Sequence, residues 1–198
     1  MIQKGGLLRK QKSERKRMEN IVIEGLTFKP YLMESEIEPA IKRVAKEIER
    51  DLGDQDPLFI CILNGAFMFA SDLTKELEKG YELSFAKYSS YNGGLYSSGV
   101  LNEVMKPQAD LTGRTVVILE DLIDTGFTLT KVVELYKQRG AKEVKIAVML
   151  SKPDAHKDAV IKPDYVGLEI PNDFIVGRGL DYQGRGRMFR DIYVKVDD

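Results

Sequence analysis

Residues 116–128 read VVILEDLIDTGFT, and this stretch decides the fold of the chain. Its first four residues are apolar and favour strands, and a strand that is apolar on both faces is typical of a parallel sheet covered by helices. Beyond the stretch, apolar residues recur at helical spacing: Leu129, Val132, Val133 and Tyr136. The pattern therefore predicts a buried strand, a polar turn and an amphipathic helix, in that order.

The polar part of this stretch suits a phosphorylated ligand. Ligands of open α/β sheets bind at the carboxyl ends of strands. A helix that begins there offers unpaired N–H groups and the positive end of its dipole, and both favour a phosphate. Thr125, Gly126 and Thr128 add hydroxyls and an unobstructed backbone. The adjacent acids Glu120 and Asp121 suit ribose hydroxyls or Mg²⁺, whereas an ordinary polar turn does not require them.

Composition argues against several classes of protein. The 198 residues suffice for one domain with a substantial core. Basic and acidic residues number 30 and 31, a balance that argues against a strongly basic nucleic-acid-binding domain. No apolar run approaches the ~18–20 residues that span a bilayer. The sequence contains neither a Walker lysine loop nor a G-x-G-x-x-G, the motifs of triphosphate and dinucleotide sites.

The single cysteine and the single histidine limit the available chemistry. Cys61 lies inside an apolar run, so we expect a buried thiol, no disulfide within the chain and a reducing cytoplasm as its compartment. His156 lies in a polar stretch and is predicted to occupy a surface loop. A histidine-based triad or a histidine-rich metal site is therefore not expected. Acid–base chemistry is left to carboxylates or lysines.

Along the rest of the chain, strands alternate with helices, which predicts a parallel sheet with right-handed crossovers. Ser35 and Glu38 fit a capping box that opens a helix. The glycine- and serine-rich residues 89–99 predict a mobile loop. The predicted strands are residues 58–63, 81–88, 116–119, 145–150, 164–169 and a fragment at 174–176. Two further helices are predicted, one over residues 66–79 closed by Gly80 and one after residue 128 ended by Gly140.

Residues 116–128 resemble the phosphoribosyl-diphosphate (PRPP) signature of type I phosphoribosyltransferases. Four later motifs follow in the order typical of the hypoxanthine-guanine branch of that family: KPDYVGLEIP at 162–171, FIVG at 174–177, LDY at 180–182 and FRD at 189–191. The resemblance extends from about residue 58 to residue 193. It implies a central parallel sheet flanked by helices, with a small hood formed by about residues 153–198 and N-terminal residues. Residues 18–198 would form this one domain, after a basic, disordered tail at residues 1–17.

The resemblance also implies a reaction of purine salvage. The 5-phosphoribosyl group of PRPP would be transferred to N9 of hypoxanthine or guanine, giving IMP or GMP plus pyrophosphate, with Mg²⁺ as the cofactor. The family is further expected to act as a homodimer or homotetramer in the cytoplasm. Neither a membrane nor a nucleic acid is expected as a partner.

The same resemblance assigns the residues of the PRPP site. Glu120 and Asp121 would hold the ribose hydroxyls, and Asp124 would face N7 of the purine as the catalytic acid–base group. The 5′-phosphate would lie in a cradle made by Asp124, Thr125, Gly126, Phe127 and Thr128. Pyrophosphate would be bound by Asn64, Gly65 and Arg190. The short loop at residues 63–66 matches one in which the family has a non-proline cis peptide bond.

Further residues are assigned to the purine, the metal and a lid. The purine would contact Lys152, Phe174, Ile175 and Asp181. A lysine donates hydrogen bonds but cannot accept them, so it favours a 6-oxopurine, and a phenylalanine ring suits stacking on a base. The metal ligands would be Glu120, Asp121 and Asp181, and Ser90 and Tyr91 would begin the lid.

Two departures and three alternatives accompany this interpretation. Asn64 stands where many relatives have lysine, so a direct cation contact to pyrophosphate is lost, and Phe127 occupies a variable position of the cradle. Xanthine differs from the other 6-oxopurines only at the 2-position and stays an alternative substrate, while Lys152 and Phe174 argue against adenine. An RNA-binding regulator on the same scaffold is favoured only by the basic tail. A PRPP-sensing structural protein would need a lost acid, and Glu120, Asp121 and Asp124 are all present.

Overall fold

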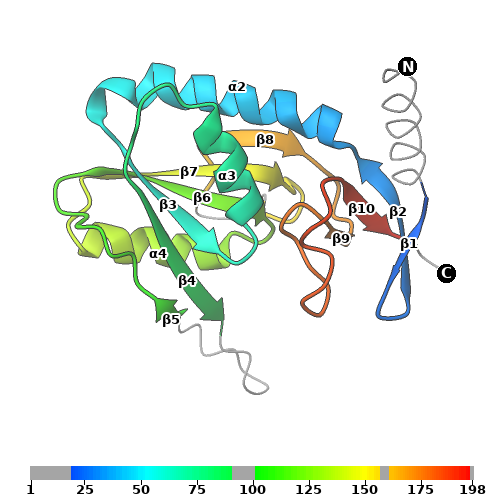
Figure 1. The fold of residues 1–198 in the computed structure, drawn as a ribbon. Helices are drawn as coiled ribbons and strands as arrows, with labels where there is room; N and C mark the ends of the chain where they lie inside the picture. The colour runs from blue at the N-terminus through cyan, green and yellow to red at the C-terminus, as the bar shows by residue number, and fades with distance from the viewer. Residues whose placement is uncertain (1–18, 91–100, 157–160, 197–198) are drawn as a thin grey trace, which may run out of the picture. The chain divides into compact units, whose positions relative to one another are not determined.

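The computed structural model describes residues 19–90, 101–156 and 161–196. The chain divides into two compact units. The core unit is Ile37–Asn172, and the terminal unit joins Met1–Glu36 to Asp173–Asp198. Each unit contains a sheet of its own (Figure 1).

The sheet of the core unit confirms the predicted α/β fold with a central parallel sheet. Its strands are β3 (Leu58–Leu63), β4 (Leu83–Ser90), β5 (Leu101–Met105), β6 (Thr115–Ile123), β7 (Glu143–Ser151) and β8 (Tyr165–Glu169). They are ordered β5-β4-β3-β6-β7-β8, so the strand with the acidic motif lies inside the sheet. Pairing is parallel from β4 to β8, and β5 runs antiparallel to β4.

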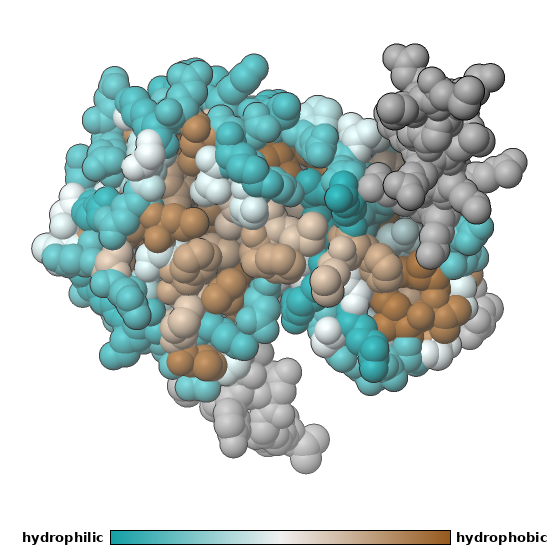
Figure 2. Space-filling view, viewed as in Figure 1, coloured by the Kyte–Doolittle hydropathy of each residue, from teal (hydrophilic) through white to brown (hydrophobic). Residues whose placement is uncertain are grey.

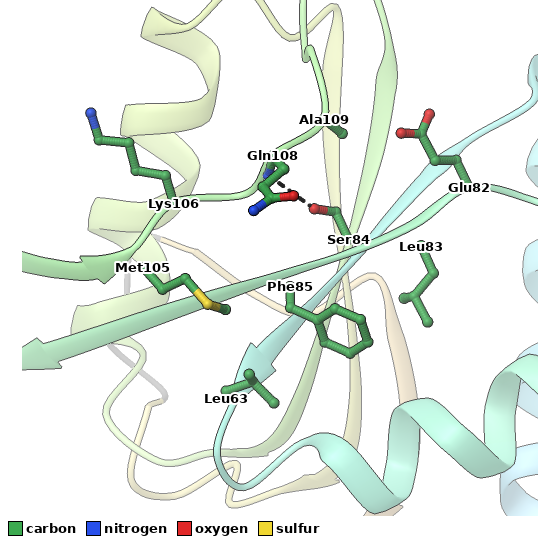
Figure 3. Close-up of a pocket in the computed structure, with 9 residues that line it drawn as sticks. All are labelled: Leu63, Glu82, Leu83, Ser84, Phe85, Met105, Lys106, Gln108 and Ala109. Atoms are coloured by element: carbon green, nitrogen blue, oxygen red, sulfur yellow. Dashed lines mark hydrogen bonds between the residues drawn. The ribbon is translucent and has the colours of Figure 1, made fainter.

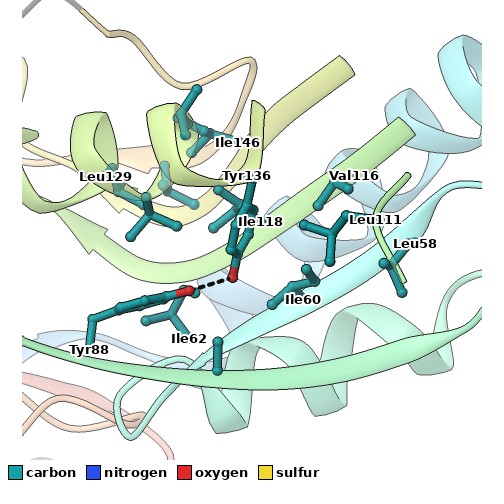
Figure 4. Close-up of a cluster of buried hydrophobic side chains, with 14 of the residues drawn as sticks. Leu58, Ile60, Ile62, Tyr88, Leu111, Val116, Ile118, Leu129, Tyr136 and Ile146 are labelled. Atoms are coloured by element: carbon teal, nitrogen blue, oxygen red, sulfur yellow. Dashed lines mark hydrogen bonds between the residues drawn. The ribbon is translucent and has the colours of Figure 1, made fainter. Parts of the chain in front are cut away.

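Helices cover both faces of this sheet, which explains its continuous apolar strands. The helices α2 (Glu34–Leu52) and α3 (Phe67–Lys75) lie on one face and α4 (Phe127–Gln138) on the other (Figure 1). Leu58 and Ile60 of β3 pack in one cluster with buried residues of α4 (Figure 4). Phe59 and Cys61 alternate with them and are buried on the opposite face. Burial of Cys61 confirms its predicted place in the core and raises the pKa of its thiol to about 12.

A hydrogen-bonded pair of tyrosines lies within the α4 cluster. The Tyr88 and Tyr136 hydroxyls are 3.1 Å apart, and the dashed line in Figure 4 marks this hydrogen bond. The Tyr88 hydroxyl also lies 3.2 Å from Glu103 Oε1. Arg139 donates to both oxygens of Glu103, at 2.8 and 2.6 Å. These contacts join β4 and β5 to the end of α4, so a polar network holds the antiparallel β4–β5 pair against that helix.

The terminal unit has a four-stranded antiparallel sheet that the sequence did not predict. Its strands are β1 (Ile21–Ile23), β2 (Leu26–Leu32), β9 (Ile175–Val176) and β10 (Ile192–Lys195), in the order β1-β2-β10-β9. A small cluster of Ile23, Phe28, Val176 and Tyr193 forms its core. Because β2 and β10 pair across most of the chain length, no local pattern indicates this sheet.

The boundary between the units differs from the expected start of a hood at about residue 153. The chain divides at Asp173 instead. The reason is β8, which pairs in parallel with β7 and so belongs to the large sheet.

Strand and helix ends also differ from the predictions. β6 continues four residues beyond 119 because Leu122 and Ile123 still pair with Leu150 and Ser151. The adjacent acids Glu120 and Asp121 therefore lie within the strand. α3 ends at Lys75, and the predicted extension to 79 is wrong because the Glu49 carboxylate accepts the Glu78 N–H at 2.8 Å.

The start of α2 and the place of His156 require two further corrections. α2 begins one residue before the predicted cap, and its first N–H groups are not satisfied by Ser35 and Glu38. Glu36 accepts the Met33 N–H at 2.9 Å, and Asp191 accepts the Glu34 N–H at 2.7 Å. His156 is buried, with 7% of its surface exposed, and not on a surface loop.

We predict that Glu103→Gln lowers the free energy of unfolding by about 1.5–3 kcal/mol near neutral pH, the range for hydrogen bonds to charged groups. Arg139 holds the pKa of Glu103 below its usual value. Stability from a carboxylate with a lowered folded pKa is present above the unfolded pKa and is lost as the pH falls through the folded pKa. Urea unfolding of both proteins at about pH 7 and about pH 3 should therefore show a difference that shrinks in acid.

The matched control is Glu134→Gln, because the Glu134–Lys131 ion pair is 3.5 Å long and half exposed. It should change stability by less than about 0.5 kcal/mol. An equal loss in both variants, or a Glu103→Gln difference that persists in acid, would contradict the role assigned to the network.

Candidate active site

The end of β6 and the start of α4 surround one hollow of about 220 Å³. All of the residues assigned to ribose and 5′-phosphate line it: Glu120, Asp121, Asp124, Thr125, Gly126, Phe127 and Thr128. The structure therefore brings this part of the predicted site together at the carboxyl edge of the sheet, where ligands of α/β folds bind.

The turn before α4 leaves its first backbone N–H groups outside the helical hydrogen bonds, and the Phe127 N–H makes only a long contact of 3.5 Å to the Thr125 hydroxyl. Gly126 is the N-cap residue with φ 73°, a left-handed conformation that favours glycine. The first helical bond runs from the Thr130 N–H to the Gly126 carbonyl at 3.0 Å, so the N–H groups before it have no intrahelical partner. Phe127 is 51% exposed. This arrangement suits a phosphate group.

Two adjacent carboxyl groups crowd one another at the end of β6. The Glu120 carboxylate accepts the Asp121 N–H at 3.1 Å. Loss of surrounding water, followed by the charge of Asp121, raises the pKa of Glu120 well above its usual range. Hydrogen-bond donors such as vicinal hydroxyls, or a cation, relieve this crowding. The pair is therefore suited to hold a ribose or a metal-bound phosphate.

The loop after β3 reaches the same edge and touches these acids. The Leu63–Asn64 peptide bond is cis, as the resemblance implied. A Cβ on Gly65 would lie 1.6 Å from Asp121 Oδ2, so only glycine fits there. Gly65 therefore lies directly against Asp121, although 56 positions separate them in the sequence, and Asn64 beside it is exposed.

Lys152 lies on the neighbouring strand end and approaches the predicted catalytic acid. Its side chain is only 7% exposed, and Nζ lies 3.5 Å from Asp124 Oδ2. The Lys152 N–H donates to the Ile123 carbonyl at 3.1 Å, which extends the β6–β7 ladder by one residue. A buried lysine is rare unless it is paired, so Lys152 is not a plain surface charge. The structure places a strong donor and a carboxylate side by side.

The other predicted residues lie in the terminal unit and are described within it. Phe174 is 44% exposed, with its ring 5.7 Å from that of Tyr182 in an edge-on arrangement. Ile175 lies in β9, the last strand of its sheet, so one backbone edge has no strand partner among the described residues. Asp181 accepts the Gly184 N–H at 2.7 Å and pairs with Arg187 at 2.5 Å.

A buried group of charged residues beside Arg190 was not predicted. Arg178 is 1% exposed and donates to the Arg190 carbonyl at 2.9 Å. Glu34 lies 4.0 Å from Arg178 and 3.6 Å from Arg190, and the buried Asp191 caps α2. A charged residue between two glycines in an apolar motif, G-R-G at 177–179, is the signal that could have indicated Arg178.

The predicted lid falls mostly outside the described residues. Ser90 ends β4, and Tyr91 belongs to the undescribed segment. Within the described residues, no three acidic, histidine or cysteine side chains cluster closely enough to hold a metal by themselves. The helices among the described residues are also too short or too polar to span a bilayer.

We predict that Gly65→Ala lowers the affinity for Mg²⁺-pyrophosphate by about 10- to 10²-fold, the scale of a lost hydrogen bond to a charged group. The new methyl group would occupy the space of the Asp121 carboxylate. Gly80→Ala is the matched control, because a Cβ at Gly80 has no neighbour within 4 Å. Calorimetric titration of both variants, with circular dichroism to verify folding, checks this. Unchanged affinity of a folded Gly65→Ala protein would contradict the close approach.

Comparisons with known proteins agree with this geometry. The family model for the phosphoribosyl transferase domain matches residues 31–183. The chain is 40% identical to a hypoxanthine-guanine phosphoribosyltransferase of Bacillus subtilis over 80% of this chain and 88% of that protein. It is 39% identical to the Streptococcus pneumoniae protein of the same name, over 82% and 89%. A crystal structure of a Staphylococcus aureus hypoxanthine phosphoribosyltransferase superposes with TM-score 0.80 at 32% identity, over 85% and 91% of the two chains. The chain therefore belongs to the phosphoribosyltransferase family.

Proposed function

We propose that the protein is a hypoxanthine-guanine phosphoribosyltransferase of purine salvage. The observation that carries the proposal is the buried Lys152 ammonium, 3.5 Å from Asp124 at the edge of the phosphate cradle. It provides a donor for a 6-oxo group beside a carboxylate that can accept a proton. The relatives named above support hypoxanthine and guanine over xanthine as the bases.

In the proposed reaction, the bond between C1′ and the pyrophosphate oxygen breaks, and pyrophosphate leaves with the electron pair. N9 of the base then forms the new bond to C1′, and Asp124 accepts the proton that the base loses, at N7. General acid–base assistance of this kind contributes about 10²–10⁴-fold. Glu120 and Asp121 hold the ribose hydroxyls, and the N–H groups of residues 125–128 hold the 5′-phosphate.

The remaining contacts follow from donor chemistry and exposure. The Asn64 amide and the Gly65 backbone meet the pyrophosphate as neutral groups, so Arg190 supplies the charge. Phe174 stacks on the base and Ile175 offers backbone groups to its edge. The exposed ring of Phe174 and the free edge of β9 support these roles. Ser90 and Tyr91 begin the lid.

Mg²⁺ is the proposed cofactor, and Glu120, Asp121 and Asp181 are the acids proposed to contact it together with the substrate phosphates, since no three of the described acids cluster closely enough to hold a metal by themselves. Mg²⁺ in phosphate sites is usually bound through one or two carboxylates together with substrate phosphates and water. The crowded Glu120–Asp121 pair supplies oxygen donors of this kind. When bound, the ion would neutralise charge on the departing pyrophosphate.

We further propose a homodimer or homotetramer that works in the cytoplasm. A hollow of about 530 Å³ lies along β4 and β5, beside Leu63 (Figure 3). Leu83, Phe85 and Met105 line it with 36–43% of their surface exposed, and Figure 2 shows apolar residues gathered on this face. Lys106 and Glu82 also line it, and Glu82 pairs with Arg114. Exposed apolar side chains gathered in this way favour burial against another protein surface, so we assign the face to a second copy.

One assay tests the proposed function as a whole. Turnover is measured with PRPP and Mg²⁺ against hypoxanthine, guanine, xanthine, adenine and uracil in parallel. Hypoxanthine and guanine should be the preferred bases. Preference for xanthine would replace the proposed substrate. Binding of RNA on a filter without any PRPP-dependent turnover would instead favour a regulator, the alternative that rests on the basic residues 1–17.

We predict that Asp124→Asn lowers kcat by about 10²-fold or more, because the amide cannot accept the base proton. Its shape is nearly unchanged, so the dissociation constant for PRPP should change little. Steady-state kinetics and PRPP titration measure the two effects separately. Turnover close to that of the unmodified protein would remove Asp124 from the chemical step.

We predict that Lys152→Ala raises KM for guanine and hypoxanthine by the loss of a charge-assisted hydrogen bond, roughly 1.5–3 kcal/mol. The preference for 6-oxopurines over adenine should fall with it. Lys162→Ala serves as the control, because Lys162 is an exposed lysine ten residues further along the chain. If the two variants had the same kinetics, the base would be recognised elsewhere.

A further inference from the structure

The only histidine of the chain is buried beside the proposed purine-reading lysine. His156 Nε2 lies 2.9 Å from the hydroxyl of Ser151, the last residue of β7. Ser151 and His156 are 2% and 7% exposed, so the contact is shielded from water. Either partner can donate, depending on the tautomer of the imidazole. Lys152 lies between them in the sequence, directly after Ser151.

We infer that His156 is a positioning residue for Lys152, acting through Ser151. The inference rests on the proposed function, because it concerns how precisely the lysine meets the 6-oxo group of the base. The hydrogen bond of His156 goes to Ser151, so its assigned task is to close the turn that follows β7.

Hydrogen bonds hold the two sides of Lys152 in different ways. On the strand side, the Lys152 N–H bonds to the Ile123 carbonyl at 3.1 Å, and the Ser151 carbonyl accepts the Ile170 N–H at 2.8 Å. β6 and β8 thereby fix the backbone as it enters Lys152. On the turn side, the Lys152 carbonyl accepts the Ala155 N–H at 3.0 Å. The His156–Ser151 hydrogen bond connects the end of that turn to the last residue of β7.

The His156–Ser151 hydrogen bond matters because the lysine side chain is long and must be held in place to meet the base. A buried lysine gives up about 1.5–2 kcal/mol of side-chain entropy. A misplacement of about 1 Å at a binding group can cost 10²-fold in rate. Lys152 Nζ is already 3.5 Å from Asp124, at the outer end of a useful contact. A turn that loosens would therefore move the donor away from the base without disturbing the phosphate cradle, which is formed by another segment.

The test compares five variants of the full chain with the unmodified protein: His156→Ala, His156→Gln, Ser151→Ala, Asp154→Ala and the double variant of Ser151→Ala with His156→Ala. The glutamine side chain can restore a bond to the Ser151 hydroxyl. Asp154 lies in the same turn but is exposed, so it is the matched control. KM for hypoxanthine, KM for PRPP, kcat and the melting temperature are measured for each. The ratio of hypoxanthine to adenine turnover is measured as well.

His156→Ala and Ser151→Ala should each raise KM for hypoxanthine by about 3- to 10-fold, the scale of one lost hydrogen bond. KM for PRPP should stay within about 2-fold, since Lys152 does not contact PRPP in the proposed function. The hypoxanthine preference should fall, His156→Gln should recover most of it, and Asp154→Ala should behave like the unmodified protein. The double variant of Ser151 and His156 should add little to either single one, because both remove the same bond.

Two results overturn the inference. One is an unchanged KM for hypoxanthine in the folded variants. The other is an equal rise of both KM values with a lower melting temperature, which indicates a merely structural brace. Should His156→Ala fail to fold, Ser151→Ala removes the same bond with a smaller cavity and decides the question. Failure of the proposed function is distinct, because the unmodified protein would then turn over no 6-oxopurine.

Discussion

The parallel pairing of β6 with β3 and β7 is the constraint on which the rest of the site depends. Leu119 of β6 is level with Cys61 of β3 and with Ala147 of β7. The residues that follow these three positions therefore emerge at one edge of the sheet. Two residues further along, the β3 loop lies level with Asp121, and Lys152 follows the last β6–β7 pair beside Asp124. Strand register thus brings together, from three distant segments, the residues proposed to contact pyrophosphate, ribose and base.

This assembly concentrates negative charge above a buried core. The Glu120 pKa is raised by burial and by its acidic neighbour, and the charges of both acids add to the effect of burial on the Cys61 thiol beneath them. Lys152 offsets part of the charge from the other side of Asp124. In the proposed function, donors on the substrate meet the remaining negative charge: the ribose hydroxyls and the ring N–H of a 6-oxopurine. A site crowded with carboxylates therefore selects ligands that bring donors or cations.

The sequence predicted the parts of the fold that a single segment determines. The apolar strand, the glycine turn and the helix after residue 128 can each be recognised from periodicity and turn chemistry. The residues of the hollow at 120–128 follow from the same stretch. The cis peptide at Leu63–Asn64 was implied only by the resemblance, since no propensity indicates it. The predicted end of β6 at residue 119 was wrong, because β6 still pairs with β7 at the polar residues that follow, and their local sequence is typical of a turn.

Features that depend on two distant positions could not be predicted in this way. The antiparallel pairing of β2 with β10 joins segments that lie far apart in the sequence. The close approach of Gly65 to Asp121 is visible in the sequence only as a glycine, which has the same appearance as any other glycine of the chain. Burial of His156 has no local sign either, because a polar residue with a partner inside the fold looks like one exposed to solvent. Hydrophobic periodicity can be recognised within one segment. The burial of a polar side chain depends on a hydrogen-bond partner that can come from another segment. Polar residues that periodicity leaves unexplained are therefore the ones whose partners are most informative once the fold is known.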